Sequence, residues 1–421
     1  MKKIIAMLGI GLLMAGGALA QSEAGAVWLL INPGARPSGM GEAGVGIADD
    51  AYASYWNPAG LGFLRGREAA LTHANWLPNL ASDIYFEFLG YRQYVKDVGT
   101  LGGNIVLVNL GEQTRTNEYG INLGTFNSFM LAVTGSYGTA LTRRSSLGVS
   151  VKMVHQHLTD QGAGAEIGKG YSTNFCFDVG YLKHQFLTKN LTLGATIANI
   201  GPKIAFIDVS QADPMPTNLK CGLAYTIDGE YNKLTIAYDV NKLLVASYSD
   251  RDIDGDEKIG GYDENGHPAT GGDYNKDGQY ENAHSDEWYK GIFTSWIDDW
   301  LLAYDSKTET DGIGKDVGGG KNKWGQKADT DGNTNDGSLA REFDKLVHNF
   351  GIEYWYSDLF AIRVGCMYDK VGDIRIKHKY PVPTFGAGLR WAGMGFDFGY
   401  TAGDAGHPRQ NTMLFSMNIK F

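Results

Sequence analysis

The chain has 421 residues, of which 58 are Gly, with 12% aromatic residues and a formal net charge of -10 at pH 7. This acidic balance argues against nucleic acid as a partner. Abundant Gly together with many Tyr and Phe is typical of strands, tight turns and aromatic girdles more than of helices.

Residues 1–20 have the pattern of a secretory signal peptide. Lys2 and Lys3 precede an apolar run from Ile4 to Met14, and Ala18-Leu19-Ala20 is a small-x-small cleavage site. Cleavage that leaves Gln21 first removes two lysines and changes the formal charge from -10 to -12. The alternative is a retained transmembrane helix, for which the run is short. No other apolar run approaches the length of a helical span, so an exported membrane protein of this kind is expected to be a barrel.

Residues 21–67 do not alternate between apolar and polar positions, and we interpret them as a compact N-terminal hatch inside a barrel mouth. Glycines permit tight turns and close backbone approach, and Asn57-Pro58 is a turn signal. The alternative is an ordinary flexible tail. We take as the hatch motif Arg36, Gly39, Met40, Gly41, Gly44, Trp56, Asn57, Pro58 and Ala59.

Residues 68–421 contain about fourteen segments in which one face is apolar or aromatic and the other is small, polar or charged. Residues 191–198, 233–241, 360–368 and 396–400 are examples, and Asp239, Glu353, Arg363 and Asp397 fall on the polar face. A soluble sandwich would also give this alternation. The three cysteines, Cys176, Cys221 and Cys366, lie far apart in such segments and are interpreted as packing residues.

The acidic insert at residues 249–340 contains two partial calcium loops. Oxygen ligands at positions 1, 3 and 5 followed by Gly match the first half of an EF-hand loop. The candidate calcium ligands are Asp250, Asp252, Asp254, Asp273, Asn275 and Asp277. Neither loop is complete, because position 12 is Gly261 or His284 instead of Glu. The alternative is a solvated, disordered acidic loop.

An apolar island lies inside this polar insert between Trp288 and Trp300. We consider it a candidate cargo-contact or barrel-mouth element, with packing onto the rim as the alternative. Its candidate contact residues are Ile292, Phe293, Trp296 and Ile297.

The pattern of the last nine residues predicts a membrane-spanning strand. Met413, Phe415, Met417, Ile419 and Phe421 share one face. The connections between segments also alternate, with short links such as 141–146 and 392–393 and long links such as 111–127, 157–170 and 201–215. Short turns on one rim and long loops on the other indicate an outer-membrane barrel with an even number of strands. We expect the mature N-terminus to be periplasmic and the long loops to be extracellular.

Several ordered motifs resemble the PorV/PorQ family, which is related to the FadL-type barrels for hydrophobic compounds. They are Gly39-Met40-Gly41-Glu42-Ala43-Gly44, Trp56-Asn57-Pro58-Ala59, residues 199–204, 216–220, 239–245, 351–356 and 360–365. The pieces Asn241-Lys242-Leu243-Leu244-Val245 and Pro216-Thr217-Asn218-Leu219 are more similar to the PorV branch. The resemblance covers the mature chain except about residues 249–340.

This resemblance implies an all-β, fourteen-stranded, FadL-like transmembrane barrel with an N-terminal hatch, located in the bacterial outer membrane. It also implies a role in the type IX secretion system, in which PorV-like proteins receive cargo from the translocon. They carry it, by its C-terminal signal domain, to the surface attachment machinery. The implied partners are outer-membrane lipid, cargo C-terminal domains, and translocon and attachment components.

No catalytic motif is evident, because G-x-S-x-G, Walker-loop and H-E-x-x-H patterns are absent from the sequence. His155 and His157 share a strand face, but no third metal ligand lies near them in the sequence. We therefore predict a non-enzymatic protein with no required cofactor, and calcium in the acidic insert as the candidate ion. The alternative functions are transport of hydrophobic small molecules, as in FadL relatives, and a porin-like structural barrel, which an unplugged lumen would favour.

Overall fold

The computed structural model describes residues 24–116, 119, 121–159, 169–206, 212–248, 261–262, 268–269, 284–297, 304–305, 310–311, 343, 345–369, 381–403 and 410–421. The chain divides into two units. The larger comprises Ala24–Leu243 and Leu346–Phe421, and the smaller comprises Met1–Glu23 and Leu244–Lys345. Each is described by itself.

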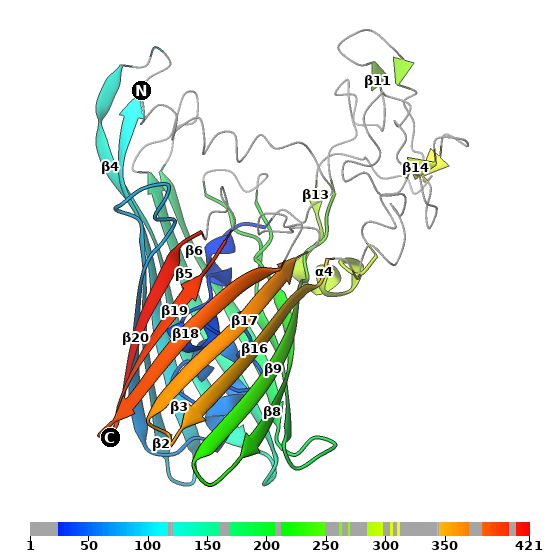
Figure 1. Cartoon of the computed structure of the whole chain (residues 1–421). Coiled ribbons are helices and arrows are strands. Elements are labelled where there is room, and N and C mark those ends of the chain that lie inside the picture. Colours follow the sequence, from blue (N-terminus) through cyan, green and yellow to red (C-terminus); the bar gives the residue numbers. More distant parts are fainter. Residues whose placement is uncertain are drawn as a thin grey trace. The chain divides into compact units, whose positions relative to one another are not determined.

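Fourteen antiparallel strands of the larger unit form a closed barrel (Figure 1), which confirms the predicted fold class. In barrel order they are β1 (Arg67–Asn75), β2 (Tyr85–Val95), β3 (Gly99–Thr116), β4 (Asn122–Ala140), β5 (Ser145–Thr159), β6 (Gly170–Lys183), β7 (Leu191–Ile200), β8 (Asn218–Asp228), β9 (Asn232–Leu243), β16 (Val347–Tyr356), β17 (Phe360–Asp369), β18 (Val382–Trp391), β19 (Met394–Thr401) and β20 (Thr412–Lys420). The barrel closes where β1 pairs with β20, with Leu71 opposite Met417. Closure satisfies the backbone groups of both end strands, as a lipid environment requires.

The strands present apolar side chains outward and polar or small ones inward. On β20, Met413 and Phe415 are 45% and 54% exposed, whereas Leu414 between them is 3% exposed. On β17, Ile362 faces outward and Arg363 is buried in the lumen. This alternation, read correctly from the sequence, provides the apolar outer band of a membrane barrel.

The two rims of the barrel differ in the length of their links. Links of a few residues join β4 to β5 at 141–144, β8 to β9 at 229–231, β16 to β17 at 357–359, and β18 to β19 at 392–393. We call this end the short-turn rim and the opposite end the long-link rim. Short turns are typical of the periplasmic side and long links of the extracellular side.

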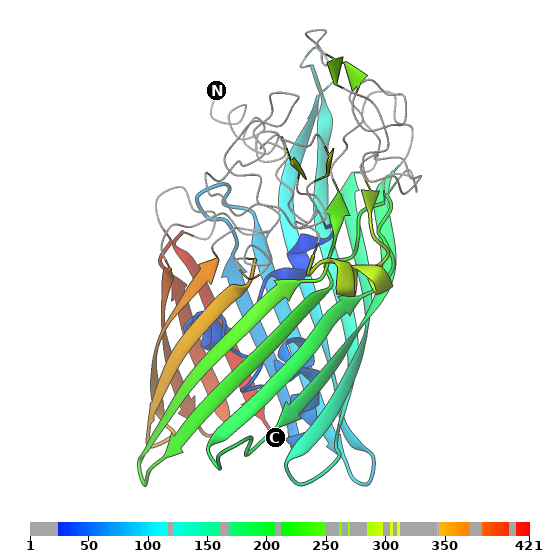
Figure 2. The same cartoon turned by 90° about the vertical axis from the view of Figure 1, so that its right-hand side faces the viewer.

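The long link expected at residues 111–127 is wrong in extent, because β3 and β4 continue through most of it. Their ladder reaches Thr116 opposite Asn122, with register shifts after Asn109 and after Arg115. Gly111 has a φ of +75°, and this permits the irregularity that lets β3 continue beyond its pairing with β2. Figures 1 and 2 show the resulting hairpin extending past the neighbouring strands at the long-link rim.

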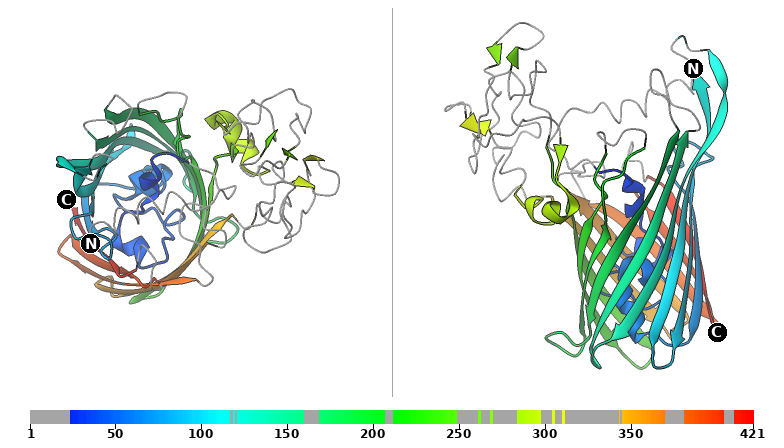
Figure 3. Two further views of the ribbon diagram at one scale, coloured as in Figure 1. Left: turned by 90° about the horizontal axis from the view of Figure 1, so that it is seen from above. Right: turned by 180° about the vertical axis from the view of Figure 1, so that it is seen from behind.

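Residues 24–66 form the hatch, which lies inside the ring of strands (Figure 3, left). It contains four short elements: η1 (Val27–Leu30), α2 (Ala35–Ser38), α3 (Ala53–Trp56) and η2 (Pro58–Phe63). Each is too short to be stable alone, so its geometry depends on packing against the wall. The lumen is therefore occupied, unlike that of the porin-like alternative.

The hatch starts at the long-link rim, whereas we expected the mature N-terminus on the periplasmic side, where the short turns lie. Gly25 N donates a hydrogen bond to Pro214 O, 2.9 Å away in the long link between β7 and β8. Trp28 Nε1 donates to Gln156 Oε1 near the same end of β5, at 3.0 Å. The hatch thus begins at the long-link rim and reaches the short-turn rim at Arg67. The order and direction of the strands are unaffected, because β1 still begins at the short-turn rim.

The smaller unit contains three two-stranded pairs and one helix among its described residues. The pairs are β10 (Ser247–Tyr248) with β13 (His284–Ser285), β11 (Gly261–Tyr262) with β12 (Pro268–Ala269), and β14 (Tyr304–Asp305) with β15 (Thr310–Asp311). The helix is α4 (Trp288–Thr294). Across the described parts of the chain, no helix has the length and apolarity needed to cross a membrane.

Candidate functional site: the hatch and its contacts with the barrel wall

Arg36 links the hatch to the wall through charged hydrogen bonds. From α2, its Nε donates to Glu353 Oε2 and its Nη2 to Glu353 Oε1, both at 2.8 Å. Its Nη1 also contacts Asp49 within the hatch. Glu353 lies on β16 and has no exposed surface. A bidentate pair of this kind fixes orientation as well as charge.

The same carboxylate begins a chain of charges along the inner wall. Glu353 Oε2 accepts from Arg363 Nε of β17 at 2.7 Å, and Arg363 Nη1 lies 2.9 Å from Asp397 Oδ1 of β19. Arg390 of β18 donates from Nη2 to Asp397 Oδ2 at 2.8 Å. Two carboxylates and two guanidinium groups from four neighbouring strands therefore neutralise one another inside the lumen, and each contact in the chain joins opposite charges. Such pairing is what allows charges to be buried.

A second wall carboxylate holds the glycine-rich part of the hatch. Asp239 of β9 is fully buried, and its Oδ2 accepts hydrogen bonds from Gly44 N at 2.7 Å and Val45 N at 2.8 Å. Gly41 N donates to Thr384 Oγ1 of β18 at 2.8 Å. The exposed backbone donors of the hatch turns are thus satisfied by side chains of the wall.

Close approach of hatch and wall depends on glycine on both sides. Gly41 has a φ of +63°, and a Cβ there would lie 2.4 Å from the carbonyl oxygens of both Cys366 and Phe350. On the wall, a Cβ at Gly148 would lie 2.1 Å from the carbonyl carbon of Pro58. Gly148 pairs with Gly138 and Gly180 on the adjacent strands. Sequence reasoning missed these wall glycines; the available signal was glycine at inward positions of strands.

The Trp56-Asn57-Pro58-Ala59 part of the hatch motif anchors the segment that includes η2. Asn57 Oδ1 accepts from Ala59 N at 3.1 Å and so caps η2, whose first residue is Pro58. Asn57 Nδ2 donates to Val45 O at 3.3 Å and to Tyr181 O of β6 at 3.1 Å. Trp56 Nε1 donates to Pro33 O at 3.1 Å. Asn57 therefore connects two parts of the hatch with the wall.

The remaining hatch-motif residues, Gly39 and Met40, pack directly on wall backbone. A Cβ at Gly39 would lie 2.8 Å from Gly386 Cα, and Met40 is fully buried against Gly351. All nine motif residues thus serve the hatch itself or its contact with the wall. They form a structural anchor, with no arrangement of nucleophile and base.

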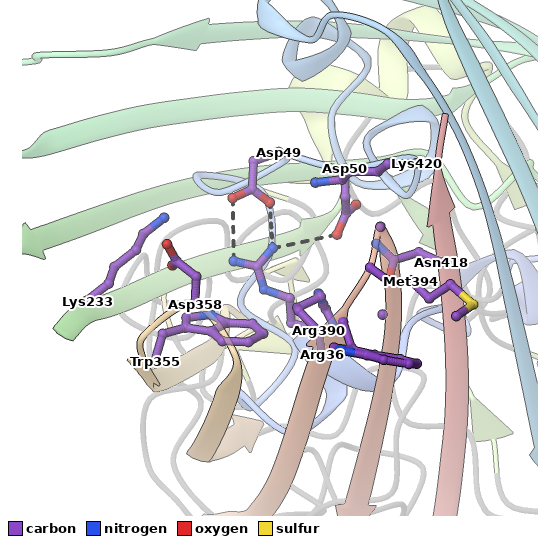
Figure 4. A pocket seen from close by; sticks show the side chains of 14 residues that line it. Arg36, Asp49, Asp50, Lys233, Trp355, Asp358, Arg390, Met394, Asn418 and Lys420 are labelled. Atoms are coloured by element: carbon purple, nitrogen blue, oxygen red, sulfur yellow. Dashed lines mark hydrogen bonds and ion pairs between the residues drawn. The ribbon is translucent and has the colours of Figure 1, made fainter. Parts of the chain in front are cut away.

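A polar pocket of about 390 Å³ opens between hatch and wall toward the short-turn rim (Figure 4). The hatch contributes Arg36, Asp49 and Asp50, and the wall contributes Trp355 and Arg390. Figure 4 shows both hatch carboxylates directed toward Arg36. Arg36, which connects the hatch to Glu353 of the wall, therefore also lines this pocket.

Asp50 is the weakly paired carboxyl of this group, 3.6 Å from Arg36 Nη1. It lies in the hatch and not in a membrane-spanning strand. Burial, followed by the charges of Asp49 and Glu68, raises the pKa of Asp50 to about 7. Its charge can therefore change near neutral pH.

An apolar cluster fills the space between hatch and wall on the side of β1–β6. It is made of large buried side chains from both parts, including Trp28, Tyr52, Phe86, Phe88 and Val106. The rings of Tyr52 and Phe88 are stacked, with centroids 4.9 Å apart. Because these side chains pack closely against one another, the cluster stabilises the closed hatch.

The calcium candidates Asp250, Asp252, Asp254, Asp273, Asn275 and Asp277 lie outside the described residues. Among the residues that the structure does describe, no group of three or more His, Cys, Asp or Glu is placed to hold a metal ion. His155 and His157 face outward near the long-link end of β5, where the ring of His157 lies 4.3 Å from that of Tyr171. They belong to the aromatic band of the outer wall.

The candidate cargo-contact residues lie in or just after α4. Ile292 and Phe293 are in the helix, and Trp296 and Ile297 are in the turn that follows. Gly291 packs closely on the backbone around Leu244 within the same unit. Phe293 is 75% exposed, and the other three are half-buried. Among the four candidate residues, Phe293 is therefore the one most available for contact, and Tyr289 of the same helix is also exposed, at 52%.

Comparison with known proteins identifies one matching family. The family model described as "Type IX secretion system protein PorV" matches residues 21–250, more than half of the chain. No curated protein matches the chain significantly.

Solved structures similar to this chain include two toluene transporters. Ralstonia pickettii TbuX is 12% identical over 94% of this chain and 100% of its own, with a TM-score of 0.47. Pseudomonas putida TodX is 14% identical over 95% and 98%, with a TM-score of 0.42. A Pseudomonas aeruginosa FadL homologue is 11% identical over 91% and 97%, with a TM-score of 0.40.

Proposed function

Because the chain belongs to the PorV family of type IX secretion system proteins, we propose that it is an outer-membrane adaptor for secreted cargo. It is a transport protein of the bacterial outer membrane. In the proposed role, its extracellular loops bind the C-terminal signal domain of a secreted protein. The complex then passes the cargo from the translocon to the attachment machinery.

The observation that carries this proposal, beside the family match, is the occupied lumen. The hatch is attached to the wall by Arg36–Glu353, by Asp239 and by Asn57. Passage of a protein through the barrel would require all of these contacts to break. Binding at the long-link rim requires none of them to break, and the strand ends joined by the longest link, Leu243 of β9 and Val347 of β16, are at that rim.

The apolar island of the insert supports the same role. Phe293 on α4 exposes three quarters of its surface. A large exposed aromatic side chain in an otherwise polar segment is typical of an interaction site. We propose that Phe293 contacts the cargo domain, with Ile292, Trp296 and Ile297 supporting it.

Binding of a purified cargo C-terminal domain to the full-length protein in detergent tests this role. We expect Phe293→Ala to weaken binding by about tenfold, the cost of losing an aromatic contact residue. Leu141→Ala is the matched control, because Leu141 is also an exposed apolar residue but lies at the short-turn rim. Equal binding by both variants would show that α4 does not contact the cargo. No binding by the unaltered protein would overturn the adaptor function.

Transport of hydrophobic small molecules is a second candidate, and the apolar cluster around Trp28 and Phe88 favours it. In that role the hatch would move to expose an apolar path. Mass spectrometry of lipids and detergent retained by the purified protein tests it. A stoichiometric apolar ligand would support transport, and its absence together with cargo binding would leave the adaptor role.

A further inference from the structure

A groove of about 430 Å³ lies on the outer face of the barrel, and its lining residues all come from β2, β3 and β4. We call it the β2–β4 groove. Leu89, Tyr91, Leu101, Ile105 and Val133 line it, and each of these side chains is more than a third exposed. They belong to the outward-facing positions of their strands, so the groove lies in the apolar band that contacts lipid.

The floor of the groove is backbone, because two glycines face outward side by side. Gly103 of β3 lies opposite Gly135 of β4. A Cβ at Gly135 would meet no atom within 4 Å, so the space above it is open. Asn104 also lines the groove, although its Nδ2 points to the lumen and donates to Ser54 Oγ of the hatch at 3.0 Å. What Asn104 presents to the outside is therefore main chain.

In a membrane, the occupant that such a groove fits is a hydrocarbon chain. The lipid-facing band of the barrel is surrounded by acyl chains, and the groove is continuous with that band. Entry of a chain brings no hydrophobic gain, because bilayer hydrocarbon is as apolar as Leu. A chain that follows the groove instead gains dispersion contacts on several sides, which a chain against a convex wall does not. The volume of the groove is in the range of small-molecule sites.

The groove approaches the short-turn rim beside two charged residues. Its lining continues through Gln93 to Val95, the last residue of β2. Lys96 and Asp97 follow directly and are exposed, and neither forms an ion pair within the described part of the chain. A cation and an anion side by side complement a zwitterionic head group, with its phosphate at Lys96 and its amine at Asp97.

We infer that the β2–β4 groove binds one glycerophospholipid of the periplasmic leaflet, with an acyl chain along Gly103 and the phosphate at Lys96. Short turns are typical of the periplasmic side, which places the head group in that leaflet. Phosphatidylethanolamine has the required chemistry, since it combines acyl chains, a phosphate and an amine. The inference is independent of the adaptor function, because it rests on the wall and the membrane around it. The wall of another membrane protein is the alternative occupant.

Native mass spectrometry of the full-length protein, stripped of lipid by detergent exchange and titrated with phosphatidylethanolamine, tests the inference. We expect one lipid to bind more tightly than any further lipid. Gly135→Phe places an outward ring beside Gly103, and we expect it to weaken this binding by about tenfold. Val151→Phe is the matched control, because Val151 lies opposite Gly135 on β5, faces outward and does not line the groove. Equal binding by the two variants, or no preferred lipid on the unaltered protein, would overturn the site.

The charge at the end of the groove provides a readout that does not alter the wall. Lys96→Gln removes the cation next to Val95, and we expect about fivefold weaker binding of phosphatidylethanolamine. Lys189→Gln, in the exposed link between β6 and β7 at the same rim, is the control. Unchanged affinity of Lys96→Gln would overturn the head-group contact. An apolar ligand in the lumen would be retained equally by all four variants, so it is distinguished from a lipid in the groove.

Photocrosslinking in native outer membranes separates a lipid from a protein occupant. With p-benzoylphenylalanine at position 133, which lines the groove, we expect adducts with lipid and none with protein. Position 151 is the control for random encounters at the outer wall. A protein adduct at position 133 but not at position 151 would assign the groove to a membrane-protein partner and overturn the lipid site.

Discussion

Arg36 of the hatch and Glu353 of the wall form a bidentate ion pair, with both N–H donors 2.8 Å from the two carboxylate oxygens. Glu353 is fully buried and also accepts from Arg363. One wall carboxylate thus neutralises a hatch cation and a wall cation together. Opening the hatch would leave a buried charge without one of its partners, which makes the closed hatch the stable state.

Replacing Glu353 with Gln should loosen the hatch. The change leaves Arg36 and Arg363 buried without their shared carboxylate, and breaking a buried pair costs about 3–5 kcal/mol. Hydrogen exchange of amides in residues 36–50 is the measurement, and we expect it to become much faster.

The matched control for this change is Glu68→Gln. Glu68 is also fully buried, but it pairs with Arg92 of the adjacent strand and with Asn418. It should lower barrel stability without selectively exposing residues 36–50. If Glu353→Gln exchanged no faster in the hatch than Glu68→Gln, the ion pair would not hold the hatch.

Alanine at Gly41 should displace the hatch from the wall. The new Cβ would meet two wall carbonyl oxygens, and the φ of +63° costs a residue with a side chain about 1–2 kcal/mol in addition. We expect reduced thermal stability in detergent and faster exchange around residue 41. Gly135→Ala is the control, because a Cβ there meets no atom within 4 Å. A Gly41→Ala protein as stable as the control would contradict the close packing described for this turn.

The hatch should be held more firmly in mild acid than in mild base. The pKa of Asp50 is raised to about 7 by burial and by Asp49 and Glu68, whereas an exposed Asp has a pKa of about 3.9. Between these values the closed hatch keeps a proton that an opened hatch releases. The stabilisation is complete below about pH 4 and is lost as the pH rises through 7.

We expect protection of the hatch amides, corrected for intrinsic exchange, to fall by about tenfold between pH 5.5 and pH 8. This is less than the full shift implies, because the Asp50 side chain retains 17% exposure. Asp50→Asn should show nearly constant protection over this range. Greater protection of the hatch amides at the higher pH in the wild-type protein would be a pH dependence of the opposite sign. That result would exclude Asp50 as the cause.

Calcium should protect the acidic insert. The partial loops that contain Asp252 and Asn275 predict weak binding, with a Kd of roughly 10⁻⁴–10⁻³ M. Limited proteolysis of residues 249–340 with and without millimolar calcium is the measurement. We expect calcium to slow cleavage, and Asp252→Asn with Asp254→Asn to remove part of the effect. Cleavage that is insensitive to calcium would show that the insert is an acidic loop without a metal site.

Much of the barrel could be predicted because its physical constraints are local. Alternation with a period of two assigned Met413 and Phe415 to the lipid face and Arg363 and Asp397 to the lumen. The same rule works for each strand by itself, since lipid and lumen impose opposite polarity on successive residues. The strand count and the contrast between the rims followed from the same pattern.

The hatch contacts could not be predicted in the same way, because they join residues far apart in the chain. Nothing local to Arg36 indicates that its partner is Glu353, and nothing local to Gly148 indicates that Pro58 lies against it. The hatch path was also mispredicted, since the contact of Gly25 with Pro214 depends on the folded barrel. The extension of β3 past Gly111 was not predicted, because it depends on a register shift in the ladder between β3 and β4 that no local pattern reveals.

Affinity capture of the full-length protein from native outer membranes, followed by identification of bound proteins, tests the central claim most directly. The adaptor account predicts recovery of exported proteins through their C-terminal domains, together with translocon or attachment components of the type IX system. Recovery of neither secretion components nor exported cargo would contradict it.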